Sequence, residues 1–167
     1  MKTVIALGSN LGNRFQILQG AIDALFDAPG LKFVKVSPVY ETDPVGGPEG
    51  QDPYLNAVVV AETTLEPRTL LERALSVENA FGRERAERWG PRTLDVDLIV
   101  VGESVCDDPD LTLPHPRAHE RAFVLVPWLE ADPTAVVPGH GRVVDLLAGL
   151  DRQGVRPRPD LTLQRPD

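Results

Sequence analysis

The chain has 167 residues, which is enough for one domain with its own hydrophobic core. Hydrophobic residues make up 42% of it and the formal net charge is −8, so a disordered chain and a general nucleic-acid binder are both disfavoured. Cys106 is the one cysteine, so no intrachain disulfide can form, and no apolar run reaches the ~20 residues of a membrane span. We therefore predict a cytoplasmic protein without nucleic-acid or membrane partners. Small-molecule partners and a monomer or weak dimer are also expected.

Hydrophobic periodicity predicts the element order β-α-β-β-α-β. Strands are expected over 3–7, 33–40, 54–61 and 93–101, a first helix between Asn13 and Pro29, and a second helix opening at Pro67. This order is typical of a ferredoxin-like α+β sandwich, in which an antiparallel sheet carries both helices on one face. The opposite face is then left for loops and ligand.

The C-terminal third is predicted as an extension of the same domain. Short helices are expected over 119–129 and 143–150, so that residues 1–150 form one domain. Residues 151–167 are rich in Pro and Arg, which favours a flexible tail.

A pair of carboxylates marks the last predicted strand of the sandwich. Side chains alternate across a strand, so Leu94, Val96 and Leu98 share one face and Asp95 and Asp97 share the other. Two neighbouring carboxylates repel unless a cation lies between them, and Mg²⁺ is commonly held by one or two carboxylates together with substrate phosphates. A solvated strand face, with the aspartates paired to nearby arginines, is the alternative.

Arginines precede this strand in a short, aromatic-containing loop. Arg83, Arg85, Arg88 and Arg92 surround Trp89 on a chain that is acidic as a whole. Guanidinium groups bind phosphate oxygens in a bidentate manner. This local positive charge indicates a small anionic ligand.

Two further motifs are ambiguous by themselves. The run GSNLGN follows a strand and opens a helix, but it lacks the features of a P-loop or a dinucleotide fingerprint and is interpreted as a tight turn with a helix cap. Asn56, two residues after Tyr54, offers amide donors and an acceptor that suit the edge of a heterocycle. A turn-closing Asn beside a half-buried Tyr is the alternative.

Other polar positions also allow two interpretations. His115 lies between two prolines and is either a phosphate donor or a surface histidine. Arg121 and Phe123 either stack on a planar ligand or form a solvated cation beside a core ring. Glu78 either accepts hydrogen bonds from a ligand or is a solvated helix charge.

Taken together, these segments resemble a known family. The motifs are GSNLGNR, YETDPVG followed by YLN, ERWGPRTLDVDLI, and PHPRAHERAFVLVP, and they span about residues 4–133. They resemble the 6-hydroxymethyl-7,8-dihydropterin pyrophosphokinases of the folate pathway. The resemblance implies the ferredoxin-like fold and the transfer of pyrophosphate from ATP to the hydroxymethyl group of the dihydropterin, which gives the pterin diphosphate and AMP.

The resemblance also implies roles for individual residues. Two Mg²⁺ ions are expected on Asp95 and Asp97. The pterin pocket is expected to comprise Thr42, Pro44, Val45, Tyr54, Asn56 and Phe123. ATP contacts are expected from Glu78, Trp89, Arg92, Leu98, His115 and Arg121. A mobile loop is expected to carry Trp89 and the catalytic Arg83 and Arg85, which act with Arg92, Asp95 and Asp97.

Three other function classes are alternatives to this one. A ferredoxin-like sensor would bind nucleotide without turnover, and a Mg²⁺-dependent phosphohydrolase would cleave ATP without a pterin. An RNA-binding sheet would stack bases on its aromatic residues. The acidic net charge and the carboxylates on the predicted open face count against the RNA reading.

Overall fold

The computed structural model describes residues 1–44, 52–81 and 93–166. In the first part of the chain the elements are β1 (Lys2–Ser9), α1 (Arg14–Leu25), β2 (Leu31–Val36), β3 (Tyr40–Thr42), β4 (Tyr54–Thr63), α2 (Pro67–Ala80) and β5 (Asp95–Val101). They are followed by β6 (Cys106–Asp108), β7 (Leu111–Leu113), a 3₁₀ turn (Ala118–Glu120), α3 (Ala122–Ala131), β8 (Val136–Val137), β9 (Gly141–Arg142), α4 (Val143–Ala148) and β10 (Val155–Pro157).

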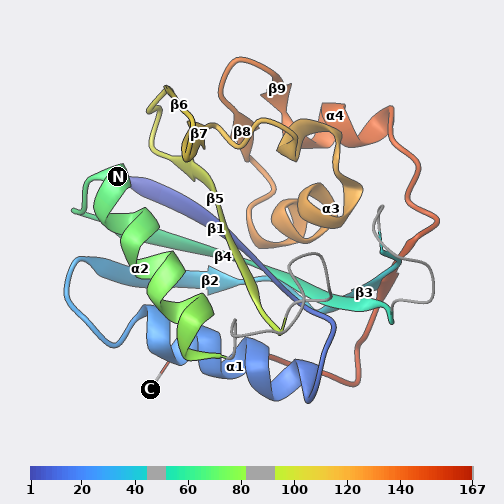
Figure 1. Cartoon of the computed structure of the whole chain (residues 1–167). Coiled ribbons are helices and arrows are strands. Elements are labelled where there is room, and N and C mark those ends of the chain that lie inside the picture. Colours follow the sequence, from blue (N-terminus) through green and yellow to red (C-terminus); the bar gives the residue numbers. More distant parts are fainter. Residues whose placement is uncertain (45–51, 82–92, 167) are drawn as a thin grey trace.

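One antiparallel sheet forms the centre of the molecule. Its strands lie in the order β10-β3-β4-β1-β5, and β2 pairs with a second stretch of β4. The predicted strand over 33–40 is thus two strands, because the chain leaves the ladder around Pro38, which has no backbone N–H to donate. Helices α1 and α2 lie on one side of the sheet and α3 lies on the other (Figure 1).

The two predicted helices form where their apolar spacing indicates. Asn13 caps α1 by accepting a hydrogen bond from the backbone N–H of Gln16 at 3.3 Å, and α2 opens at Pro67. The buried faces of these helices pack against the sheet and against each other. They consist of Leu18, Ala21, Ile22 and Leu25 in α1 and of Leu70, Ala74 and Val77 in α2.

A second hydrophobic core lies on the other face of the sheet, the face predicted to be open for loops and ligand. Trp128 of α3 is fully buried there against Val4, Val60 and other strand residues. The expectation of an open face is therefore wrong for the part of the sheet beneath α3. The face is open at one end of the sheet, near the last residues of β1 and the first residues of β5.

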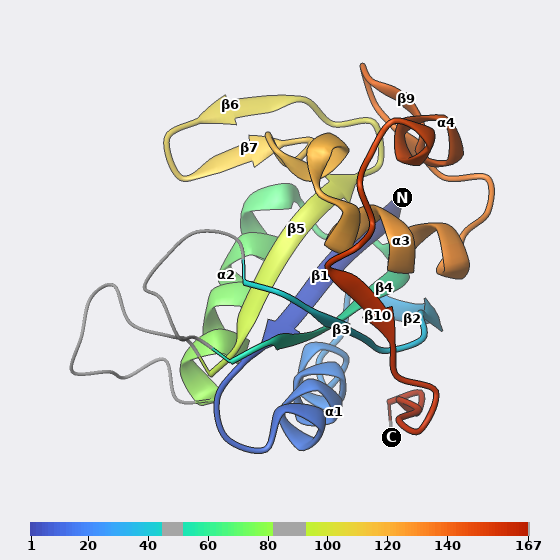
Figure 2. The same ribbon diagram turned by 90° about the vertical axis from the view of Figure 1, so that its right-hand side faces the viewer.

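The segment after residue 150 does not form a loose tail. Val155–Pro157 pairs with β3, and the backbone N–H of Gln164 donates to the side chain of Gln19 at 2.8 Å. Figure 2 shows β10 beside β3, with the chain continuing toward α1. The predicted helices over 119–129 and 143–150 are confirmed as the 3₁₀ turn with α3 and as α4. In the described part of the chain, no helix has both the length and the apolarity to cross a membrane.

Replacing Leu163 tests the contribution of this C-terminal segment. The side chain is 6% exposed and belongs to the core beneath α1 and α2. We expect Leu163→Ala to lower the free energy of unfolding by about 2–3 kcal/mol, through lost burial and the cavity left behind. Urea denaturation measures the change. Val105→Ala is the control, since Val105 is 81% exposed and should change stability by less than about 0.5 kcal/mol. Equal stabilities of the two variants would show that the segment is loose after all.

Candidate active site

The register of the three central strands brings the predicted polar residues together. Gly8 of β1 pairs with Asn56 of β4 on one side and with Asp95 of β5 on the other. Two residues back along β1, Ala6 pairs with Asp97. Small side chains on the middle strand therefore separate an amide from two carboxylates. A hollow results, with Ala6 and Gly8 as its floor.

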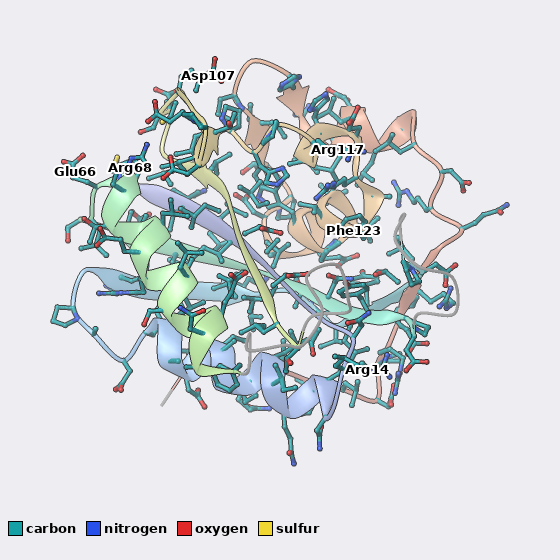
Figure 3. The ribbon with its side chains drawn as sticks, viewed as in Figure 1. Arg14, Glu66, Arg68, Asp107, Arg117 and Phe123 are labelled. Atoms are coloured by element: carbon teal, nitrogen blue, oxygen red, sulfur yellow. The ribbon has the colours of Figure 1, made fainter. Side chains whose placement is uncertain are left out.

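This hollow is a cleft of about 200 Å³. The predicted residues that line it are Thr42, Tyr54, Asn56, Asp95, Asp97, Arg121 and Phe123. A second cleft of about 480 Å³ shares Thr42, Arg121 and Phe123 with the first and adds Pro44. The labelled Phe123 and Arg117 lie on the α3 side of the sheet, above the strands (Figure 3). The sheet thus forms one wall and the start of α3 the other.

The two aspartates lie on the strand face that the alternation predicts. Leu94, Val96 and Leu98 are buried in the core beneath α1 and α2, and Asp95 and Asp97 line the cleft on the other face. The side chain of Leu98, a predicted ATP contact, therefore points away from the cleft.

Glu78 is buried and contacts the aspartate strand directly. It is 4% exposed, and one of its carboxylate oxygens accepts a hydrogen bond from the backbone N–H of Val96 at 2.8 Å. The interpretation as a solvated helix charge is therefore wrong. Because Val96 lies between Asp95 and Asp97, Glu78 of α2 fixes the backbone that carries both carboxylates.

The amide of Asn56 is held by Thr42 on one side and lies close to Gly8 on the other. Its Nδ2 donates a hydrogen bond to the hydroxyl of Thr42, and the residue is 8% exposed. On its other side, a Cβ added at Gly8 would lie 2.7 Å from Asn56 Oδ1. Only glycine at this position leaves the amide where it is. No local pattern in the sequence indicates this role of Gly8, and the run GSNLGN by itself indicates a tight turn.

The wall opposite the sheet combines a cation with an aromatic ring. The guanidinium carbon of Arg121 lies 5.5 Å from the ring centroid of Phe123, so the two side chains are neighbours on this wall. Burial and the neighbouring Arg117 lower the pKa of Arg121, and Asp97 acts in the opposite direction. Arg117 also lines both clefts, although the sequence analysis did not single it out.

His115 is neutral at physiological pH. Burial, then Arg121 and Arg117, lower its pKa to about 4. Its Nδ1 accepts a hydrogen bond from the backbone N–H of Arg117 at 3.2 Å, and its own backbone N–H donates to Ile99 at 2.8 Å. The proton of the neutral ring is therefore on Nε2, which is available as a donor.

The carboxylate pair suits a hard cation that brings other ligands with it. Within residues 1–44, 52–81 and 93–166, no three His, Cys, Asp or Glu side chains are grouped so that they could hold a metal ion. Asp95 and Asp97 supply carboxylate oxygens on one wall of a cleft that also contains Arg121. Mg²⁺ needs only one or two carboxylates when phosphates and waters complete its octahedron.

Part of the predicted site lies outside the described residues. These positions are Val45, Arg83, Arg85, Trp89 and Arg92. Their predicted roles stay predictions.

The sequence is similar to a known protein family and to individual members of it. A sequence model of the family described as 7,8-dihydro-6-hydroxymethylpterin-pyrophosphokinase (HPPK) matches residues 4–133. The 2-amino-4-hydroxy-6-hydroxymethyldihydropteridine pyrophosphokinase of Mycobacterium tuberculosis is 47% identical, over 99% of this chain and 95% of its own. The enzyme of the same name from Methylorubrum extorquens is 43% identical, over 92% of this chain and 96% of its own.

A solved structure provides the likeness in fold. Wild-type Plasmodium falciparum HPPK-DHPS, crystallised with pteroate, superimposes with a TM-score of 0.70 over 88% of this chain at 13% identity. This chain covers 44% of that longer chain, and at such low identity the likeness concerns the fold alone. The family model and the extended identity to its members are decisive: the chain belongs to the 7,8-dihydro-6-hydroxymethylpterin-pyrophosphokinase family.

Proposed function

We propose that the chain transfers pyrophosphate from ATP to the hydroxymethyl group of 6-hydroxymethyl-7,8-dihydropterin, giving the pterin diphosphate and AMP. One observation carries the proposal: a single cleft places the held amide of Asn56 across Gly8 from the carboxylate of Asp95. An amide edge suits a heterocycle, and a carboxylate pair suits metal-bound phosphate. A pyrophosphokinase needs both beside each other.

The pterin is assigned to the end of the cleft nearest β3. The Asn56 amide, oriented by Thr42, offers a donor and an acceptor to the edge of the pterin ring. Phe123 and Tyr54 provide aromatic surfaces for its faces. Backbone groups around Thr42 and Pro44 are assigned to the same pocket, as the family resemblance implies.

The phosphates are assigned to the end nearest β5. Asp95 and Asp97 would hold the Mg²⁺ ions, which when bound neutralise phosphate charge and favour loss of the hydroxyl proton. Glu78 keeps the backbone of these aspartates in place through Val96. Arg121 adds positive charge on the opposite wall. Neutral His115 can donate from Nε2 to a phosphate oxygen without adding charge.

The chemistry requires positioning more than acid–base strength. The pterin hydroxyl oxygen forms a bond to the β-phosphorus of ATP, the bond from that phosphorus to the α–β bridging oxygen breaks, and the hydroxyl proton is lost as AMP departs. Phosphoryl-type transfer depends mainly on alignment and on stabilising charge. The fixed amide at one end of the cleft and the fixed carboxylates at the other supply this alignment.

The finer expectations on fold and cell biology are also part of the proposal. We infer that β1, β2, β4 and β5 with α1 and α2 are a ferredoxin-like βαββαβ unit, since the pairing order β2-β4-β1-β5 matches it. We infer one domain that includes residues 151–166, since Leu163 lies in its core. A cytoplasmic location is proposed from the reaction and from Cys106, which is a free thiol. A monomer or weak dimer stays a prediction.

A nucleotide product assay with ATP and Mg²⁺, with and without the dihydropterin, tests the function. We expect pterin-dependent AMP and no ADP. Asp97→Asn should lower the rate by on the order of 100-fold with an unchanged fold, because a ligand for the charge-stabilising metal is lost. Asp107→Asn is the control, an exposed aspartate in β6 far from the cleft (Figure 3). AMP or ADP without pterin would establish a phosphohydrolase instead, and ATP binding without product would establish a sensor.

Gly8→Ala tests the assignment of the pterin end. The added methyl would lie 2.7 Å from Asn56 Oδ1, so the amide must move. We expect the KM for the pterin to rise about tenfold and the KM for ATP to change less than about twofold. Gly149→Ala is the matched control, since its nearest neighbouring atom would be 3.9 Å away. Equal losses for both substrates would contradict the assignment of Asn56 to the pterin.

The lowered pKa of His115 predicts a pH-dependent stability. Its folded pKa of about 4 lies below the unfolded value of about 6.5, so the unfolded chain binds more protons between these values. Stability is therefore full above pH 6.5 and falls as the pH drops toward 4. Between pH 7 and pH 5, His115→Asn should lose about 1 kcal/mol less than the unsubstituted protein, after allowance for partial solvent exposure. Urea denaturation at both pH values measures the difference, and parallel losses would contradict the prediction.

A further inference from the structure

Three arginines converge on one carboxylate beside the pterin end of the cleft. Glu41 accepts hydrogen bonds from Arg14 at 3.1 Å and from Arg158 at 3.0 Å, and Arg156 lies 3.8 Å from its other oxygen. Arg14 begins α1, whereas Arg156 and Arg158 belong to the C-terminal segment. The start of α1 and the C-terminal segment thus meet at Glu41, the middle residue of β3.

Glu41 is the neighbour of a residue that lines the cleft. Side chains alternate along β3, so Glu41 points away from the cleft and Thr42 points into it, where its hydroxyl accepts from Asn56. Arg14 also donates to the carbonyl of Pro53 at 2.9 Å, immediately before Tyr54. Arg14 therefore links Glu41, which precedes Thr42, to Pro53, which precedes Tyr54.

The backbone of the C-terminal segment is also hydrogen-bonded to β3 and to the residue that follows it. β10 pairs with β3 so that Val155 lies opposite Thr42, and Gly154 accepts a hydrogen bond from the backbone N–H of Asp43 at 3.0 Å. Arg156 donates to the carboxylate of Asp43 at 3.0 Å. Gly154 and Val155 line the second cleft together with Thr42. The C-terminal segment therefore reaches the site itself.

These contacts have little to contribute to overall stability. The side chains of Arg156 and Arg158 are 44% and 30% exposed, and ion pairs at such positions typically contribute about 0–1 kcal/mol. Catalytic geometry is far more sensitive, since a displacement of about 1 Å can cost up to about 100-fold in rate. A network of this kind is better suited to holding β3 in place than to holding the fold together.

We propose that Arg156 and Arg158 are positioning residues for pterin binding. Through Glu41 and Asp43 they hold β3 so that Thr42 and its backbone meet the pterin edge, while Arg14 holds the other side of the pocket. The proposal rests on the proposed function, and it adds the C-terminal segment to the determinants of pterin affinity. The aspartate end of the cleft, and with it ATP binding, is independent of this network.

Arg158→Ala tests the proposal in the full-length protein. We expect the Kd and KM for the dihydropterin to rise about tenfold, the KM for ATP to change less than about twofold, and the melting temperature to fall by no more than about 3 °C. Glu41→Ala should raise them at least as much, because it removes the partner of all three arginines. The double variant should be no worse than Glu41→Ala, because Arg158 acts on β3 through Glu41. Arg158→Lys, which retains a cation near Glu41, should recover part of the pterin affinity.

Arg68→Ala is the matched control. Arg68 is likewise an exposed arginine with two carboxylate partners, Asp108 at 2.5 Å and Asp110 at 2.7 Å, but it lies far from Phe123 and the cleft (Figure 3). It should leave both KM values unchanged. Unchanged pterin affinity in Arg158→Ala, or equal losses for pterin and ATP, would overturn the positioning role. Failure of the unsubstituted protein to bind pterin or to release AMP would instead overturn the proposed function.

Discussion

The pairing of β1 between β4 and β5 is the constraint on which the rest of the site depends. It places Gly8 between Asn56 and Asp95, and Ala6 beside Asp97, on one face of the sheet. A slip of one residue in either pairing would send these side chains to the opposite face, into the core beneath α1 and α2. The apolar residues that alternate with them resist such a slip, because it would expose them to solvent. The hydrophobic core thus specifies the geometry of the polar cleft, and the small residues of β1 leave the space that a ligand needs.

The same elements supply both the core and the site. α2 buries Val77 against the sheet and, one residue later, directs Glu78 to the backbone of the aspartate strand. α3 buries Trp128 in the second core, while its first turn presents Phe123 to the cleft. The functional groups are therefore mounted on packed helices and strands whose positions are fixed by burial. Such mounting is what a reaction governed by alignment requires.

Much of this arrangement could be predicted from the sequence, because period-two and period-3.6 patterns report directly on which side chains are buried. They identified β1, β4, β5 and both early helices, and they placed Asp95 and Asp97 on the face opposite Leu98. They could not report contacts between distant segments. The burial of Glu78 depends on how α2 packs beside β5, and the need for glycine at position 8 depends on the approach of the Asn56 side chain. β10 has only three residues and includes a proline, so its role as a strand comes from pairing with β3 and not from any local pattern.

The pKa shifts of Arg156 and Arg121 have opposite directions, which distinguishes an arginine paired within the protein from one that faces the cleft. A hydrogen bond to Asp43 raises the pKa of Arg156, so its positive charge is already matched by a carboxylate of the protein. Arg121 differs, because burial and the nearby Arg117 lower its pKa and make its charge costly. An anion entering the cleft would relieve that cost. On an acidic chain, Arg121 therefore places a positive charge that burial disfavours at the wall of the cleft opposite Asp95 and Asp97.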